Sequence, residues 1–195
     1  TESGISSDKL KGKLKMLPDE WQVLEQSIGR IFKSPLYIDE TPGLTLIEFT
    51  AKAKRLVREK GVRIIFVDYL QLMHSGKPMA GGFSKVQEVT EISNTLKTTA
   101  KELNVPIIAL AQLNRNLMSR MGSNGKPLLS DLKDSGSIEQ DADIVVFLHR
   151  PGLIGLTDDP EELAKTEVIF AKNRNGQVGS VNMRYVGHLM KFEDD

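Results

Sequence analysis

The sequence predicts an α/β domain in which a mainly parallel sheet is flanked by helices and an antiparallel hairpin lies near the C-terminus. Two nearly continuous apolar runs, 62–67 and 106–111, are typical of parallel strands buried on both faces. Segments with helical spacing alternate with these runs, which favours a parallel sheet with helical connections. The pair Asn175-Gly176 lies between two apolar stretches and is a hairpin turn signal.

Each predicted element follows from a local pattern. Helices are predicted where apolar residues recur at helical spacing, and two of them open with capping-box residues, Thr45-x-x-Glu48 and Ser84-x-x-Gln87. The predicted helices are 19–30, 45–60 and 84–103. The predicted strands, which are short apolar runs bounded by turn residues, are 36–39, 62–67, 106–111, 144–148, 167–171 and 178–186. The polar segment 1–17 is predicted to be irregular or displaced, and the segments 74–84 and 114–136, which contain glycine, are predicted loops.

The composition predicts one ordinary globular domain, 1–195, that is large enough to bury a sizeable core. The chain has no cysteine, so it has no disulfide framework and no cysteine-based zinc site, and its three histidines show no metal-ligand spacing. No signal peptide or membrane-spanning apolar run is visible, which predicts a cytoplasmic location and no membrane partner. A net charge of zero argues against a wholly basic nucleic-acid coat, although not against a local basic patch.

The segment around Asp68 has the pattern of the metal-side half of an ATP motor site, but a phosphate-binding loop is missing. Such a loop needs glycines followed by Lys and then Ser or Thr. The nearest strings are Gly12-Lys13-Leu14, Gly76-Lys77-Pro78 and Gly125-Lys126-Pro127. None has Ser or Thr after Lys, and proline offers no N–H to a phosphate. The chain is therefore expected to be a motor domain that is truncated at its N-terminus.

Two polar residues follow the two buried runs. Asp68 follows the first, and an Asp at the carboxyl edge of a parallel sheet can hold Mg²⁺ beside a nucleotide, usually through water. Gln112 follows the second, where it could sense a γ-phosphate. Each residue could instead end its strand for structural reasons, because Asp suits a following turn and Gln can cap a strand end.

Two further segments are candidates. The tip of the predicted hairpin carries Lys172-Asn173-Arg174. These cations could be solvated surface charges, or the hairpin could present an arginine finger to the nucleotide of a neighbouring subunit. In the loop 114–136, Lys133 and the backbone N–H groups of 134–136 could hold phosphate, although an ordinary surface loop would look similar. No aromatic residue is interleaved there, so base stacking is not predicted.

Together these pieces resemble the C-terminal motor domain of the DnaB-type replicative DNA helicases, which are hexameric RecA-like ATPases. The matching strings run in family order from about Asp19 to the end. They are Ile38-Asp39-Glu40-Thr41-Pro42, Val67-Asp68-Tyr69-Leu70-Gln71-Leu72-Met73, Ala100 to Arg115, Ser130 to Asp143 and Ala171 to Gly176. The strings Asp-Tyr-Leu-Gln-Leu and Ser-Gly-Ser-Ile-Glu-Gln-Asp-Ala-Asp are the most specific.

The resemblance implies a RecA-like core of the P-loop NTPase class and ATP with Mg²⁺ as cofactors. Asp68 would be the acid on the Mg²⁺ side, and Gln112 the sensor that couples nucleotide to DNA. Lys172 and Arg174 would reach the nucleotide of the neighbouring subunit, with Arg174 as the finger. The family's catalytic glutamate lies upstream of the first residue of this chain, and Glu40 is not its equivalent.

The resemblance also implies partners. Lys133, Asp134 and Gly136 would hold the backbone of single-stranded DNA in the channel of a homo-hexamer, and primase and a helicase loader would be protein partners. The family usually has Arg-Glu-Ser-Gly where this chain has Lys133-Asp134-Ser135-Gly136. Lysine keeps the charge but lacks the planar fork of arginine.

The predicted function is therefore that of part of an ATP-dependent helicase that unwinds duplex DNA by translocating on one strand as a ring, with the fragment alone inactive. One alternative is a non-catalytic DNA-binding or assembly module that kept a RecA-like fold. The other is a related RecA-like ATPase from a phage or a recombination system.

Overall fold

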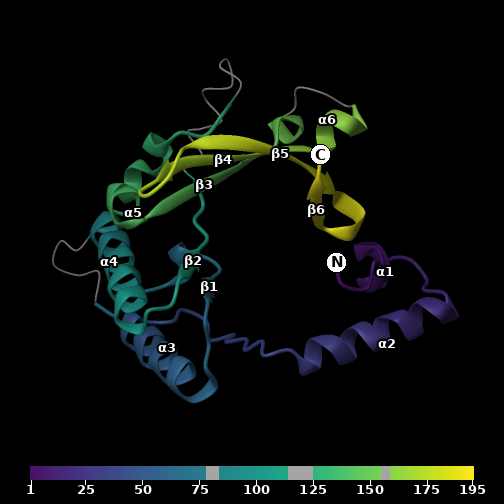
Figure 1. Ribbon diagram of the computed structural model, residues 1–195, viewed down its shortest axis with the longest axis horizontal. Helices are drawn as coiled ribbons and strands as arrows, with labels where there is room; N and C mark the ends of the chain where they lie inside the picture. Colours follow the sequence, from purple (N-terminus) through teal and green to yellow (C-terminus); the bar gives the residue numbers. More distant parts are fainter. Residues whose placement is uncertain (78–83, 114–124, 155–158) are drawn as a thin grey trace. The chain divides into compact units, whose positions relative to one another are not determined.

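A computed structural model describes residues 1–77, 84–113, 125–154 and 159–195 (Figure 1). The α-helices are α1 (Ser7–Leu10), α2 (Pro18–Lys33), α3 (Leu46–Lys60), α4 (Lys85–Leu103), α5 (Gly136–Asp141) and α6 (Pro160–Ala164). The strands are β1 (Ile65–Val67), β2 (Ile107–Ala109), β3 (Ile144–His149), β4 (Lys165–Asn173), β5 (Gly179–Val186) and β6 (Lys191–Asp194). Short 3₁₀ helices are η1 (Leu70–Leu72), η3 (Leu129–Ser135), η4 (Pro151–Ile154) and η5 (Gly187–Leu189).

The chain divides into two compact units. The first comprises residues 1–38, 146–169 and 179–195, and the second comprises 39–145 and 170–178. Strands β1 and β2 pair in parallel, with Phe66 opposite Ile108. A second sheet has the strand order β3-β4-β5-β6, in which β5 and β6 are antiparallel. The predicted α/β class, with parallel strands, flanking helices and a C-terminal hairpin, is confirmed.

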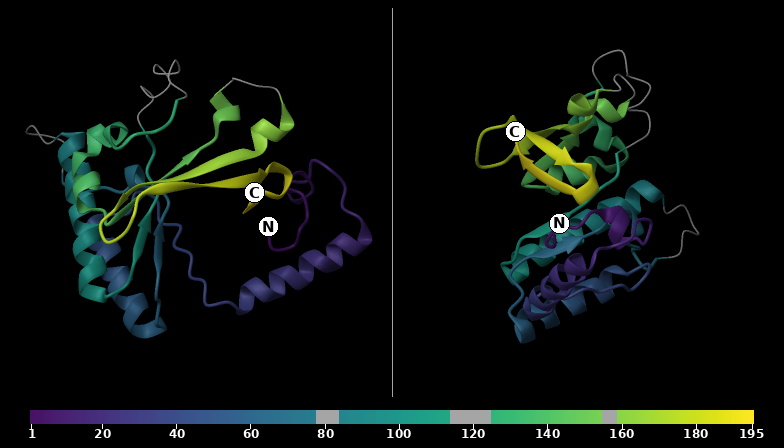
Figure 2. Two further views of the ribbon diagram at one scale, coloured as in Figure 1. Left: turned by 45° about the horizontal axis from the view of Figure 1, so that its top comes forward. Right: turned by 90° about the vertical axis from the view of Figure 1, so that its right-hand side faces the viewer.

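The core of the second unit lies between two helices and one face of the parallel strands. Figure 2 shows α3 and α4 side by side, and the two helices are in contact. The buried side chains are Leu46, Phe49, Ala53, Leu70, Met73, Ile92 and Leu96. Ile65, Val67 and Ile107 pack against this cluster from the strands. Since alternate strand residues point to opposite faces, Phe66 and Ile108 lie on the other face.

The helices of the second unit begin where the sequence predicts. The hydroxyl of Thr45 accepts from the N–H of Glu48, and the carboxylate of Glu48 accepts from the N–H of Thr45 at 3.0 Å. Ser84 and Gln87 form the same reciprocal pair at the start of α4. Helix α3 ends at Gly61, whose φ of 66° is left-handed, a conformation that glycine adopts without steric cost. Both predicted capping boxes are confirmed.

In the first unit, helix α2 covers the predicted helix 19–30 and extends it to Pro18 and Lys33. Much of its apolar surface is exposed, including Trp21 and Phe32. The segment 1–17 contains the short helix α1, which Ser6 caps by accepting from the N–H of Lys9. The extent of the motor domain, 1–195, stays a prediction.

Also in the first unit, one arginine and two aromatic side chains lie in contact. The guanidinium of Arg150 lies 4.1 Å from the centre of the Tyr185 ring, which in turn packs against Phe192 of β6. Strand β6 itself was not predicted, because its sequence Lys-Phe-Glu-Asp has no apolar alternation. No helix among the described residues is long and apolar enough to cross a membrane.

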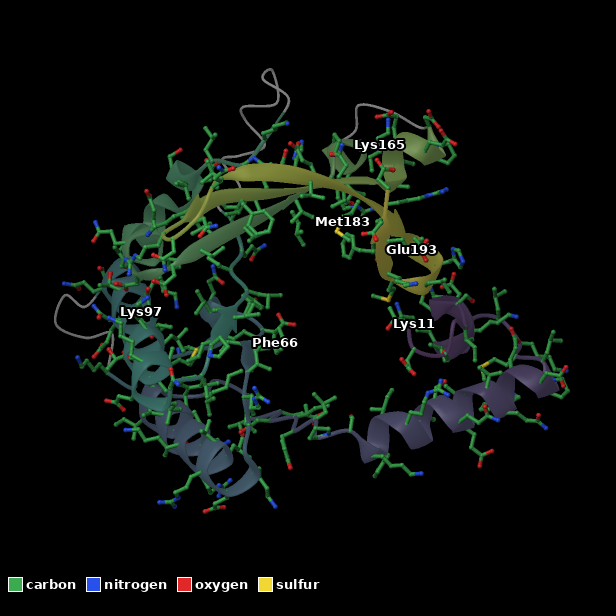
Figure 3. All side chains as sticks on the ribbon, in the orientation of Figure 1. Lys11, Phe66, Lys97, Lys165, Met183 and Glu193 are labelled. Carbon is green, nitrogen blue, oxygen red and sulfur yellow. The ribbon has the colours of Figure 1, made fainter. Side chains whose placement is uncertain are left out.

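Several sequence predictions are wrong. No strand forms at 36–39, because Asp39 instead draws the chain into a turn, accepting from the N–H of Thr41 at 3.0 Å and from its hydroxyl at 2.6 Å. Strands β1 and β2 are not buried on both faces: Phe66, labelled in Figure 3, is 63% exposed. Each has only the other as a described partner, and the helices cover one face.

The predicted loop 114–136 is wrong only in its last part, because residues 125–128 form no helix or strand, as predicted. Residues 129–135 form η3, and Gly136 begins α5. Residues 114–124 lie outside the described residues, as do 78–83 of the predicted loop 74–84.

Candidate functional site

Asp68 and Gln112 follow the two paired parallel strands. Asp68 comes directly after β1, and Gln112 comes three residues after β2. Main-chain hydrogen bonds continue the pairing beyond the strands: the N–H of Leu110 donates to the carbonyl of Val67, and the N–H of Leu70 donates to the carbonyl of Leu110, both at 2.9 Å. The structure therefore brings Asp68 and Gln112 to the same edge, as the sequence predicts.

A residue that the sequence reasoning missed links the two strand ends. The side-chain amide of Gln71 donates to the carbonyl oxygen of Gln112 at 3.0 Å and accepts from the N–H of Gln112 at 3.3 Å. Gln71 lies in η1 between the buried residues Leu70 and Met73, which fix the position of this turn. The signal was present in the string Asp-Tyr-Leu-Gln-Leu, but only the fold reveals its partner.

Asp68 is exposed at this edge, and its peptide bond to Tyr69 is cis. Among the described residues no group of three or more acidic or histidine side chains could hold a metal ion. A single exposed carboxylate fits Mg²⁺, which keeps several waters and binds through one or two carboxylates together with the phosphates of a nucleotide. It does not fit a metal held by the protein alone.

Lys172 and Arg174 lie at the end of β4 and both contact helix α5. The ammonium of Lys172 donates to the main-chain carbonyls of Glu139 and Gln140. The guanidinium of Arg174 donates to the carbonyl of Gln140 at 3.3 Å. These carbonyls belong to the last turn of α5, where cations are favoured by the helix dipole. In this structure the two predicted trans-acting cations therefore bind their own chain.

Asp143 connects these cations to helix α4. Its carboxylate pairs with Arg174, with 2.9 Å between Nη1 and Oδ1, and its other oxygen pairs with Lys97 of α4. The hydrogen bond from Lys97 is the main reason that the pKa of Asp143 is lowered from its ordinary value. Nearby, the hydroxyl of Ser93 donates to the carboxylate of Asp141 at 2.7 Å. Sequence reasoning missed Lys97 and Asp143, because they lie 46 residues apart.

The predicted DNA-binding residues lie next to this cluster in the chain. Lys133 and Asp134 are in η3, and Gly136 is the first residue of α5. The side chains of 133–135 lie outside the described part of the structure. Helix α5 thus has one predicted DNA-binding residue at its start and the hairpin cations at its end. Within the part of the chain that the structure describes, no hydrogen bond or ion pair joins Asp68 or Gln112 to the hairpin cations.

Comparison with known proteins decides the family. The family described as "DnaB-like helicase C terminal domain" matches residues 1–194. This chain belongs to that family. A replicative DNA helicase DnaB of Mycobacterium leprae is 44% identical over 91% of this chain, and one of Geobacillus stearothermophilus is 42% identical over 98% of it. The chain spans 28% and 40% of the lengths of these two relatives.

Solved structures agree with this membership. One described as an ATPase domain matches with a TM-score of 0.89 at 33% identity, over all of this chain and 67% of that one. A structure of a DnaB-like replicative helicase and its interactions with primase matches with a TM-score of 0.87 at 33% identity, over all of this chain and 46% of that one. The predicted RecA-like fold and the predicted resemblance to the DnaB-type helicases are confirmed.

Proposed function

We propose that this DnaB-like domain is the motor of an ATP-dependent replicative DNA helicase, which unwinds duplex DNA by translocating on a single strand as a homo-hexameric ring. The observation that carries the proposal is the meeting of Asp68 and Gln112 at one edge of the parallel pair, in a chain that matches the family over residues 1–194. In open α/β folds, ligands bind at the carboxyl ends of the strands.

The roles of the residues follow from their positions. Bound Mg²⁺ would offset the negative charge on the phosphates of ATP. Asp68 would hold that ion through water, and its exposure leaves the carboxylate accessible. Gln112 would sense the γ-phosphate. Lys172 and Arg174 would present positive charge to the nucleotide of the neighbouring subunit, where an arginine finger contributes a large part of the rate.

DNA and protein partners complete the proposal. The segment with Lys133, Asp134 and Gly136 would contact the phosphates of single-stranded DNA, which fixes register without reading sequence. The relative solved in its interactions with primase suggests primase as a partner of this chain too. A helicase loader and a cytoplasmic location stay predictions.

The first test is hydrolysis. We expect the 195-residue chain alone to show no significant ATPase activity, because its sequence has no Gly-Lys-Ser/Thr loop for the phosphates. Measurable hydrolysis that is lost on Asp68→Ala would contradict this expectation.

A chimera tests the motor itself. This chain would replace the segment that it matches in the Geobacillus stearothermophilus helicase, and ring assembly, ATPase activity and unwinding would be measured. We expect DNA-stimulated hydrolysis that falls about 1,000-fold or more on Arg174→Ala. Rings that bind single-stranded DNA without hydrolysing ATP would instead favour the non-catalytic module.

A further inference from the structure

Arg174 is held at three points by one short segment of its own chain. Its main-chain N–H donates to the carbonyl of Asp143 at 2.8 Å, its guanidinium pairs with the carboxylate of Asp143, and it also donates to the carbonyl of Gln140. A hairpin-tip arginine that is only solvated charge would not need such contacts. Its side chain nevertheless stays 47% exposed, so a ligand can still reach it.

The carboxylate of Asp143, which holds Arg174, also pairs with a side chain of helix α4. Lys97, labelled in Figure 3, pairs with Asp143, and its side chain is only 18% exposed. Lys97 lies on α4 directly after Leu96, which is buried in the core of the second unit. The positions of Lys97 and of the Asp143 carboxylate therefore depend on the packing of the core, although the Arg174 side chain is partly exposed at the surface.

The charges and donors of the cluster suit an anion. Lys97 and Arg174 together outnumber the one carboxylate that they share, so this group of three keeps a net positive charge. The guanidinium has five N–H donors, and two of its contacts are the ones just described. Further N–H groups thus remain for a phosphate while the pair with Asp143 stays in place.

We propose that Asp143 is the positioning residue of Arg174: braced by Lys97, it holds the guanidinium in the orientation from which it reaches the triphosphate of the adjacent copy. This inference rests on the proposed function, in which Arg174 acts in trans. Fixing a flexible side chain before it binds removes an ordering cost that would otherwise reduce activity by about 2- to 10-fold.

Asp143→Asn is the informative substitution. It keeps the shape of the side chain and the main-chain bond to Arg174 but removes the charge. Lys101→Gln is the matched control, because Lys101 lies on the same helix as Lys97 and acts on Asp143 only through its charge at a distance.

The first measurement uses the 195-residue chain itself. NMR of the Arg174 side-chain N–H groups is expected to show a dispersed signal that exchanges slowly with water. Asp143→Asn should shift this signal toward that of a free arginine and speed its exchange, although the bond to Gln140 remains, whereas Lys101→Gln should leave it in place. The main-chain amide of Arg174 should keep its protection from hydrogen exchange in both variants. An Arg174 side-chain signal unchanged by Asp143→Asn would overturn the proposal.

The second measurement is a double-mutant cycle in the chimera. We expect Asp143→Asn to lower DNA-stimulated ATP turnover about 2- to 10-fold. Asp143→Glu, which keeps the carboxylate, should lose less turnover than Asp143→Asn. In a protein that already carries Arg174→Gln, Asp143→Asn should lower turnover no further. An equal loss in both backgrounds would mean that Asp143 does not act through Arg174. An inactive wild-type chimera would count against the proposed function, and the NMR result would still decide the role of Asp143.

Discussion

Gln71 joins two strand ends with a single side chain. Its amide has the same donor and acceptor as a peptide group, so it extends the hydrogen bonding between β1 and β2 to Gln112. Because η1 is anchored by buried residues on either side, Gln112 is tied to the element that follows Asp68. A displacement of the main chain at Gln112 would therefore stretch or break its two hydrogen bonds to Gln71.

The isosteric substitution Gln71→Glu tests this link. It keeps the acceptor and removes the donor, which places a carboxylate oxygen against the carbonyl of Gln112. We expect the free energy of unfolding to fall by about 1 kcal/mol, and the amide of Gln112 to exchange its hydrogen faster. Gln87→Glu is the control, because Gln87 only accepts from the N–H of Ser84 and a glutamate can do the same. Equal effects of the two substitutions would argue against the link.

At the scale of single elements, helix boundaries depend on backbone conformation as well as caps. Gly61 ends α3 with φ at 66°, whereas Gly29 lies inside α2. A Cβ at either position would meet no atom within 4 Å, so space does not distinguish them. A difference in stability between the two alanine variants would therefore come from the backbone conformation at each position and not from steric contacts of the new Cβ.

Gly61→Ala and Gly29→Ala should therefore have opposite signs. Alanine at Gly61 is expected to cost about 1 kcal/mol of unfolding free energy, because a side chain disfavours the left-handed conformation. Alanine at Gly29 is expected to stabilise by about 0.5–1 kcal/mol, because glycine weakens a helix interior. Denaturant unfolding of both variants measures this, and destabilisation by both would contradict the argument.

The elements also show what a sequence can and cannot predict. Both capping boxes and the hairpin turn were predicted correctly, because each depends on residues within a few positions of one another. The burial of Phe66 was predicted wrongly, because it depends on which other elements cover the strand. The site divides in the same way. Arg174 was singled out from the sequence by the family resemblance, and its role stays a prediction. The contacts of Asp143 and Gln71 could not be predicted, because their partners are far away in the sequence.

At the scale of the whole molecule, charge links stability to pH. Among the described residues, the carboxyl groups with a lowered pKa are Glu20, Asp39, Glu48, Glu88 and Asp143. The pKa of Asp39 falls from an ordinary value of 3.8 to about 2, first because Lys52 hydrogen-bonds to it and then because Thr41 does. A group with a lowered folded pKa stabilises the fold above its unfolded pKa and loses that contribution as the pH falls toward its folded pKa.

We therefore expect the free energy of unfolding to be nearly constant near neutral pH and to decrease as the pH falls below 4.5. The contribution of Asp39 should be lost between pH 3.8 and about 2. Asp39→Asn should make this decrease shallower, although only slightly, because the group lies at the surface and is screened by solvent. Denaturant unfolding of both proteins across that pH range checks the prediction. If the free energy of unfolding of the variant had the same pH dependence as that of the wild type, Asp39 would not contribute to the loss of stability in acid.

The exposed face of α2 gives the molecule an optical property. Trp21 is the only tryptophan in the chain, and it is 60% exposed there, on the same helix as Phe32 at 89%. All of the indole fluorescence consequently originates from this one helix. The emission wavelength of Trp21, and its quenching by a soluble quencher, would therefore report whether this face of α2 is exposed to solvent or covered by a partner. The measurement needs no attached label.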